Sequence, residues 1–483
     1  MLDDDASTTQ DPIVYKAPYH SGVMVDPHLD KIKAAGGTSI IKDNQSLRKL
    51  LQTYFLTEYT FFPAFHKRLF STRHGIRLQG VLLLPFGPCN PRIGLYSTAT
   101  PARIIGPDSG VPKLWVPGAS QKRAAAIVLA IVYDANGRDE EGKAYLAQAV
   151  AAAHAMQLFS PQRSSDDRKF YSRAVTAWAL VHSFHVFKAP LLSMPPSIPL
   201  PEQDKCYGDF LFRFPAAQGP VSLNYANTFR ALSEFRHIMN NVAAVFFSDL
   251  KNTPDSTVDR IKGFCIRLDS WYQTCRLISK PERYLFHDIS SSSKHPTHSP
   301  QLMLTVSSMH YYQLITFLLE TLRMTSTPAL ADGSVQKVLS DAKIRIETLI
   351  RLYYLRHGFE SYDIMVISMH FIGFMQAKAL DVTEAAGLES RRSTVVLVAK
   401  GLQDQSKNCY LARLVLRILK SSVGRENQFL LKEVDDEEED AEAERVMKEQ
   451  VKSSWPIDLE WIDVDPEKKR LDNLIKRTKE LEL

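Results

Sequence analysis

The chain contains 483 residues, of which 45% are hydrophobic and 23% are charged. These values are those of a soluble globular protein with a large core, and the length allows two to four domains. The formal net charge of +5 is small for this size and excludes a general electrostatic affinity for nucleic acid.

The cysteines and the first residues of the chain indicate in which cellular compartment the protein is expected. The five cysteines form no C-x-x-C pair, and none stands beside a histidine at zinc-ligand spacing. This pattern favours free thiols in a reducing compartment over a disulfide framework. The opening MLDDDASTTQD is acidic and polar, unlike a signal or transit peptide. Because no run approaches the roughly 18–20 apolar residues of a membrane span, we expect an intracellular protein without a membrane segment.

The first predicted helix follows an N-terminal leader. Residues 1–40 show no sustained hydrophobic period and are expected to be disordered. In SLRKLLQTYFLTEYTFFPAFHKRLF, apolar residues recur at i, i+3, i+4 and i+7, the stripe of a half-buried helix. The stripe consists of Leu47, Leu50, Leu51 and Tyr54. Pro63 should end or kink this helix, because proline lacks the backbone donor that a helix needs.

The stretch at 75–120 differs from its flanks. It is rich in Gly, Pro and Ser, shows no usable period, and is interpreted as coil that holds the only strand-like patches of the chain. The next helix is predicted at AAAIVLAIVY. A second helix then opens with Asp139, Glu140 and Glu141, which suit the positive end of a helix dipole.

The remainder of the chain predicts an all-α fold. A helix containing Trp178 leads into an extended Pro-rich connector at 194–202. Further helices are predicted at 225–250, 257–277, 302–323, 336–357, 363–380, 393–404 and 407–423. We therefore expect one large multi-helix domain at 41–425 with a coil-rich insertion at 76–124, followed by a flexible acidic linker at 426–454 and a charged helix or tail at 455–483.

The aromatic stretch RLYYLRHGFESYD, residues 351–363, is interpreted as a helix corner rather than a catalytic site. The helical stripe before it consists of Ile346, Leu349, Ile350 and Tyr353. Gly358 follows His357, at a place where helices often close in the left-handed conformation that glycine tolerates. Phe359 should then pack back, and the serine or aspartate of ESYD should cap the next helix. The next stripe consists of Ile364, Ile367, Phe371 and Phe374.

Motifs that carry chemistry are mostly missing. The sequence has no G-x-x-x-x-G-K-S/T loop, G-x-G-x-x-G turn or G-x-S-x-G nucleophile elbow. His182 and His185 have a spacing that could share a metal, but they lack further ligands nearby and are interpreted as core or rim residues. We therefore predict no catalytic, cofactor-binding or metal-binding residue.

One acidic pattern leaves an enzyme alternative open. Asp435, Asp436 and Glu439 match the D-D-x-x-E motif by which all-α isoprenoid enzymes hold Mg²⁺ and diphosphate. The motif lies in a block of like charge without an apolar face, which favours a solvated or interaction tract. With Trp455 and Trp461 beyond it, the tract could also form an acidic-aromatic activation segment.

Several blocks together resemble a known family. They are LLQTYFLTEYTFFPAFHKRLF, GRDEEGKAYLAQAVAAAHAMQLF, SRAVTAWALVHSFHVFKAPLLSMPPSIPLPE, IETLIRLYYLRHGFE, STVVLVAKGLQDQSKNCYLARLVLRIL and SSWPIDLEWIDVDPEKKRLDNLIKR. They are similar in order and spacing to the fungal-specific transcription factor domain, or middle homology region, of binuclear zinc cluster regulators, in its nitrate-assimilation-regulator-like branch. The resemblance covers about 45–75 and 126–480.

The chain departs from this family at two places. The DNA-binding module of the family holds two zinc ions with six N-terminal cysteines, whereas this chain has no cysteine before Cys89. We therefore expect no zinc cluster and no direct DNA reading on this chain. The segment at 76–124 does not resemble the helices of the family, which indicates a divergent insertion or a mis-spliced gene model.

The resemblance implies a regulatory role without catalysis. It predicts control of RNA polymerase II transcription in the nucleus, through protein partners, a homodimer or heterodimer, or a small effector, with DNA contacted only indirectly. It assigns Arg356, His357, Gly358 and Phe359 to a structural family motif. The basic KKR at 468–470 and KR at 476–477 are candidates for nuclear import. The alternative is a helical interaction scaffold in the cytoplasm, with no transcriptional role.

Overall fold

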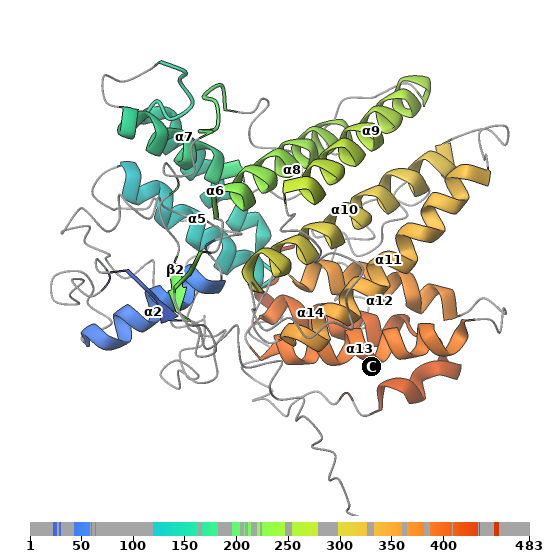
Figure 1. The fold of residues 1–483 in the computed structure, drawn as a ribbon. Helices are drawn as coiled ribbons and strands as arrows, with labels where there is room; N and C mark the ends of the chain where they lie inside the picture. The colour runs from blue at the N-terminus through green and yellow to red at the C-terminus, as the bar shows by residue number, and fades with distance from the viewer. Residues whose placement is uncertain are drawn as a thin grey trace, which may run out of the picture.

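The computed structural model describes residues 23–26, 29, 43–57, 59, 63, 119–162, 167–181, 196–202, 207, 211–213, 220–222, 225–246, 254–278, 298–325, 333–359, 365–380, 387–407, 409–432, 434 and 449–453. Most of these residues are helical (Figure 1), which confirms the predicted all-α class. The segment at 76–118, His182, His185, the acidic motif and the tail from 454 lie outside the described residues.

The helices follow one another in an order close to the predicted one. They are α2 (Asn44–Thr57), α5 (Ala119–Ala135), α6 (Asp139–Ala155), α7 (Asp167–Val181), α8 (Tyr225–Phe246), α9 (Pro254–Ile278), α10 (His298–Thr325), α11 (Gly333–His357), α12 (Met365–Leu380), α13 (Leu388–Ser406), α14 (Tyr410–Ser422) and the 3₁₀ helix η5 (Arg425–Leu431). Each helix expected after residue 224 is present with slightly shifted ends, and residues 196–202 of the Pro-rich connector contain bends and no regular secondary structure.

A small antiparallel sheet corrects two expectations. Its strands are β1 (Val23–Met24), β2 (Leu211–Arg213) and β3 (Val221–Ser222), paired in that order. The expectation that strand-like patches occur only at 75–120 is therefore wrong. The prediction of a disordered leader also fails at β1, because Met24 and the nearby Leu29 are only 5% and 2% exposed and belong to the core.

Helix α2 shows why its residues form a helix. At its start, Asp43 accepts a 2.6 Å hydrogen bond from the backbone N–H of Ser46, and this bond lowers the pKa of the Asp43 carboxyl. The four residues of the predicted stripe are all buried. The helix ends at Thr57, before the proline expected to end it. There the N–H of Tyr59 bonds to Tyr54 O at 2.8 Å, which folds the chain back onto the helix.

Helices α5 and α6 form a close antiparallel hairpin (Figure 1). At their contact, a Cβ built on Gly142 would stand 2.5 Å from Asp134 Oδ1 and 3.0 Å from Ala130 O, so only glycine fits. The turn between them contains Gly137 at φ +68°, in the left-handed region. As predicted, Asp139, Glu140 and Glu141 form the first turn of α6.

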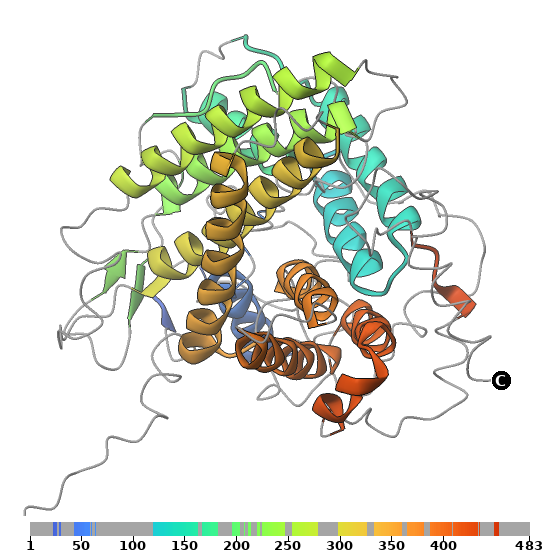
Figure 2. The same ribbon diagram turned by 90° about the vertical axis from the view of Figure 1, so that its right-hand side faces the viewer.

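Two clusters of buried side chains hold the helices together. The larger one joins α2, the sheet, α5 to α7, α12 to α14 and one part each of α8, α10 and α11, and the smaller one is formed by the other parts of α8, α10 and α11 together with α9. Figure 2 shows the long helices α8 to α10 beside the shorter bundle of α12 to α14. Tyr312 and Ile367 pack against both clusters, so the apolar interior is continuous.

The core continues past residue 425, where an acidic linker was expected to begin. Helix η5 packs beside α13, and its last residue, Leu431, is 5% exposed. Val434 is 1% exposed and belongs to the larger cluster. The body of the protein therefore reaches the edge of the acidic run.

Candidate functional site

The predicted motif at the end of α11 is a structural corner. Gly358 has φ +66° and donates its N–H to Tyr354 O at 2.9 Å, which closes the helix as expected. The ring of Phe359 stacks on Tyr353 and Tyr354, with ring centroids 5.9 Å and 5.2 Å apart. Phe359 is only 1% exposed. Of the predicted motif, Arg356 and His357 lie in the last helical turn, and their side chains are outside the described set.

The corner packs against helix α13. The amide of Gln405 donates a 2.6 Å hydrogen bond to Phe359 O, and both residues are almost fully buried. One turn earlier, Gly401 faces the Phe359 ring, because a Cβ there would stand 2.5 Å from Phe359 Cδ2. The described side chains of the corner therefore serve to fix α11 to α13.

A polar contact joins the same two helices near the other end of α13. Arg351 donates to Thr394 Oγ1 at 2.6 Å and to Ser390 O at 3.1 Å. Glu347 accepts hydrogen bonds on both carboxylate oxygens, from Ser390 Oγ at 2.9 Å and from Gln376 Nε2 at 3.3 Å. The groups satisfy one another, so this network is a packing device rather than a binding site.

The strongest candidate for function is the turn between α5 and α6, because a C-terminal segment at 449–453 is docked on it. The N–H of Lys452 donates to Gly137 O at 3.1 Å, and the N–H of Glu140 donates to Lys452 O at 3.4 Å. Lys452 thus uses both its backbone N–H and its backbone carbonyl on this turn. Figure 2 shows this short segment beside the α5–α6 hairpin, although the two are far apart in the sequence.

Charged side chains surround the docked segment. The Arg138 guanidinium reaches Glu141 at 3.1 Å and the side chain of Gln450 at 3.4 Å. Lys452 Nζ lies 3.9 Å from the same Glu141 carboxylate. The guanidinium also lies over the Tyr133 ring, 4.9 Å from its centroid. One carboxylate is thus shared between two cations, one from each side of the contact.

Apolar contacts complete the docking. Leu414 of α14 and Val451 of the segment both approach Gly137, 3.1 Å and 3.7 Å from a Cβ built there. An added Cβ at Gly137 would press on Leu414, while Val451 would lie at an ordinary contact distance from it. Ser453 is fully buried, so the segment is anchored at both its middle and its end. Val434, which precedes the acidic stretch 435–448, is also buried in the core. The described residues that flank this stretch on either side are therefore both held on the body of the protein.

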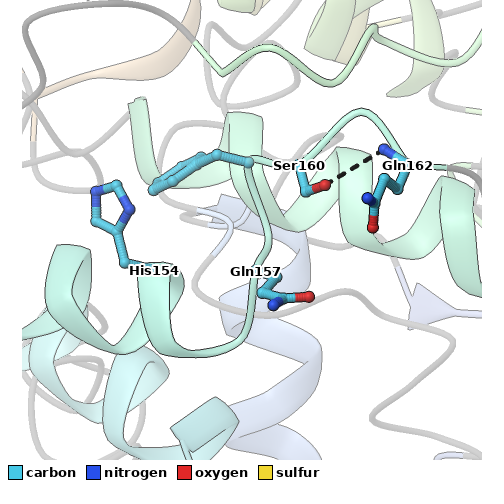
Figure 3. A pocket seen from close by; sticks show the side chains of 5 residues that line it. His154, Gln157, Ser160 and Gln162 are labelled. Carbon is cyan, nitrogen blue, oxygen red and sulfur yellow. Dashed lines mark hydrogen bonds between the residues drawn. The ribbon is translucent and has the colours of Figure 1, made fainter.

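A second feature is a hollow of about 310 Å³ after α6 (Figure 3). It is lined by His154, Gln157, Phe159, Ser160 and Gln162. The rings of His154 and Phe159 meet edge to face at 4.9 Å, and Ser160 Oγ accepts a 3.3 Å bond from the N–H of Gln162. The hollow is open and polar, and it belongs to the loop that leads to α7.

Two buried ionisable residues, His310 and Arg236, lie beside the smaller cluster. His310 stacks on Phe235 with ring planes 3° apart, and burial together with the charge of Arg236 lowers its pKa to about 3. Burial also lowers the pKa of Arg236 to about 10. His310 is therefore neutral at physiological pH and serves as part of the core.

Neither thiols nor metal ligands form a recognisable centre in the described part of the chain. Cys265, Cys275 and Cys409 form no disulfide, and burial raises the pKa of Cys265 to about 11 and that of Cys275 to about 12. Among the described residues, no group of three His, Cys, Asp or Glu side chains could hold a metal ion. Within the same residues, no helix has the length and hydropathy of a membrane span.

Comparison with known proteins adds no further constraint. No family model, curated protein or solved structure matches the chain. The resemblance to the fungal regulatory domain therefore stays a prediction. The docking of residues 449–453 was missed by the sequence reasoning, because the five residues EQVKS carry no pattern that distinguishes them from the charged surroundings.

Proposed function

We propose that this protein regulates RNA polymerase II transcription in the nucleus, as the helical regulatory region of a fungal zinc-cluster-type factor. It acts through partner proteins. The resemblance of the sequence blocks supports the biological setting. The docked segment at 449–453 supports the mode of action, because regulation by intramolecular contact requires a segment that can bind and leave.

The contact has the strength expected of a reversible latch. It includes two backbone hydrogen bonds, the hydrogen bond from Arg138 to Gln450, an ion pair at 3.9 Å, the half-buried Val451 and the buried Ser453. A hydrogen bond contributes about 0.5–1.5 kcal/mol net, and an exposed ion pair contributes about 0–1 kcal/mol. A partner segment that offers the same backbone groups to Gly137 and Glu140 can therefore compete with residues 449–453.

Release of the latch would change the acidic stretch that it holds. The stretch 435–448 contains the run DDEEEDAEAE and lies between anchored residues Val434 and Glu449–Ser453. With the segment docked, both ends of the stretch are tied to the body. With it released, only Val434 remains as an anchor, and the acidic residues become a free tail that a positively charged partner can bind.

A second function, a helical scaffold without a role in transcription, is favoured by one surface observation. Ile344 and Leu355 on α11 are 59% and 65% exposed. They stand eleven residues apart, which places them within about 20° of one another around the helix. Two exposed apolar side chains on one helix face offer hydrophobic contacts to a partner protein.

Tethering to a promoter distinguishes the two functions. The full chain is fused to an unrelated DNA-binding module upstream of a reporter gene and compared with the module alone. The regulatory proposal predicts a severalfold change in reporter output and nuclear accumulation of the unfused protein. Unchanged output together with a cytosolic distribution would reject it in favour of the scaffold.

A further inference from the structure

The loop after α6 presents a serine in a defined geometry. Helix α6 closes with the N–H of Leu158 bonded to Ala153 O at 3.0 Å and that of Gln157 bonded to His154 O at 2.9 Å. Gln157 takes the left-handed conformation, with φ 52°. The chain then turns outward, and Ser160 is half-exposed with two exposed residues after it.

The sequence around this serine is Ser160-Pro161-Gln162-Arg163. Protein kinases that require proline after the acceptor have a binding groove that offers no partner to the next backbone N–H. Proline lacks this N–H, whereas any other residue would bury an unsatisfied donor there. An arginine three residues beyond the acceptor fits an acidic patch in such a groove. Of the five Ser-Pro or Thr-Pro pairs in the chain, only those at Thr100 and Ser160 have this arginine.

The hollow at Ser160 suits an anion. Its polar side chains, those of His154, Gln157 and Gln162, all carry N–H donors, and no carboxylate lines it (Figure 3). None of these three side chains makes a hydrogen bond within the described protein. The volume of about 310 Å³ exceeds that of a phosphate group severalfold.

A cation, Arg173, stands beside the hollow. Arg173 of α7 donates to Ser160 O at 3.1 Å and also to Gln162 O, so its guanidinium is fixed against the loop. The Nε atom of Arg173 finds no acceptor among the described residues, and none of their carboxylates pairs with this arginine. The guanidinium also lies 5.5 Å from the ring centroid of Phe170, which limits its movement.

We propose that Ser160 is a phosphorylation site for a proline-directed Ser/Thr kinase, and that the hollow holds the resulting phosphate beside Arg173. In the transfer, Ser160 Oγ attacks the γ-phosphorus of a nucleoside triphosphate, and the Oγ–P bond forms as the bond to the β,γ-bridging oxygen breaks. The nucleoside diphosphate leaves with the electron pair of that bond, and the hydroxyl proton passes to a carboxylate of the kinase. The inference does not depend on the proposed role in transcription.

The phosphate would join two helices. It adds a charge of about −1.5 to −2 at the loop, where Arg173 comes from α7 and His154 from the last turn of α6. Charge-assisted hydrogen bonds to both would fix the loop between these helices. Phosphorylation is therefore a means of stiffening the connection between α6 and α7.

The first test is phosphorylation of the folded full chain by a recombinant proline-directed kinase with ATP, read by mass spectrometry of the peptide that contains Ser160. We expect one phosphate there and none in Ser160→Ala. Pro161→Ala should slow the reaction by about tenfold or more. Thr100→Ala serves as the matched control and should leave the rate at Ser160 unchanged. Absence of phosphate at Ser160 under conditions that modify Thr100 would overturn the proposal.

The second test asks where the phosphate lies. The second pKa of phosphoserine is about 6, and ³¹P NMR follows it directly. We expect a lower value in the folded phosphoprotein than in the same protein in urea, because cations favour the dianion. Arg173→Gln should remove most of this difference, and His154→Gln, at an exposed position, should remove part of it without affecting folding. Equal values in the folded and unfolded phosphoprotein would overturn the proposed contact with Arg173 and His154.

Discussion

The ring of Phe359 lies against Gly401 so closely that a Cβ on Gly401 would stand 2.5 Å from Phe359 Cδ2 and 2.6 Å from Met369 Sδ. These residues belong to three different helical elements, the end of α11, α12 and α13. The corner predicted from the aromatic stretch is therefore held by shape as well as by the hydrogen bond from Gln405. Gly401→Ala should lower the free energy of unfolding by about 1–3 kcal/mol, because the ring must move in a packed core.

Urea unfolding of the full chain measures this effect. Gly263→Ala in α9 is the matched control, because a Cβ there would meet nothing within 4 Å. The control should instead gain about 0.5–1 kcal/mol from better helix propensity. Equal effects of the two substitutions would contradict the close contact at Phe359.

At Gly358 of the same corner, the backbone conformation rather than the available space disfavours a larger residue. Its φ is +66°, and a Cβ there would meet nothing within 4 Å. Gly358→Ala should therefore cost about 1–2 kcal/mol through the left-handed backbone alone. Gly358→Asn should cost less, since asparagine tolerates this conformation better. If Asn and Ala at this position were equally destabilising in urea unfolding, the conformational explanation would be wrong.

Gln157 is the reverse case, a left-handed residue that is not glycine. Its φ is 52° in the closing turn of α6. Gln157→Gly should raise the free energy of unfolding by up to about 1 kcal/mol, because relief of backbone strain exceeds the added freedom of the unfolded chain. Lys143→Gly, at an exposed position within α6, should lower stability by about 1 kcal/mol. Thermal unfolding of the two variants beside the wild type should show opposite shifts.

His310 should make stability fall in acid. Burial and the charge of Arg236 lower its pKa from 6.5 to about 3, so between these values the folded state binds fewer protons than the unfolded state. The free energy of unfolding therefore decreases as the pH falls from about 6.5, by up to about 1.4 kcal/mol per pH unit from this group.

The measurement is a comparison of His310→Phe with wild type between pH 4 and 7. Phenylalanine keeps the stacking on Phe235 and cannot titrate. The wild type should lose stability more steeply than the variant as the pH is lowered. Burial raises the pKa of Glu234, which acts in the opposite direction, but this contribution is common to both proteins. Parallel pH profiles would show that His310 is not buried as the structure has it.

Much of the helical architecture could be predicted from the sequence, because the spacing of apolar residues in a long amphipathic helix indicates which face is buried. The stripe at Leu47–Tyr54 is buried as its spacing indicated, and so are Ile346, Ile350 and Tyr353 of the second stripe, whereas Leu349 is partly buried. The strand at Leu211–Arg213 was missed although DFLFRF alternates, because three residues are too short for a period-2 pattern to stand out among helices.

Other features depend on contacts between distant residues. The docking of Lys452 on Gly137 is made by backbone atoms, which no side-chain pattern reveals. The stacking of His310 on Phe235 places a polar residue in a core, and hydrophobic periodicity counts such a residue as surface. The left-handed Gln157 occupies a place where the sequence signal for a helix end, glycine, is missing.

Hydrogen exchange reports whether residues 449–453 are docked. The amides of Lys452 and Glu140 should be protected in the full chain, because they donate to Gly137 O and Lys452 O. Val451→Asp should abolish the protection at Lys452, because it places a charge against the apolar side chains at Gly137. Ile266→Asp, at a residue that is 70% exposed on α9, should leave it unchanged. Rapid exchange at Lys452 in the wild type would mean that the segment is not held.

The most direct test of the regulatory proposal is the reporter output of the promoter-tethered full chain with and without Val451→Asp, at equal protein levels. The substitution should release residues 449–453 and free the acidic stretch 435–448, so we predict a severalfold higher output than for wild type. Ile266→Asp should match the wild type. Equal outputs from the wild type and Val451→Asp, with release of the segment shown by hydrogen exchange, would contradict regulation through this contact.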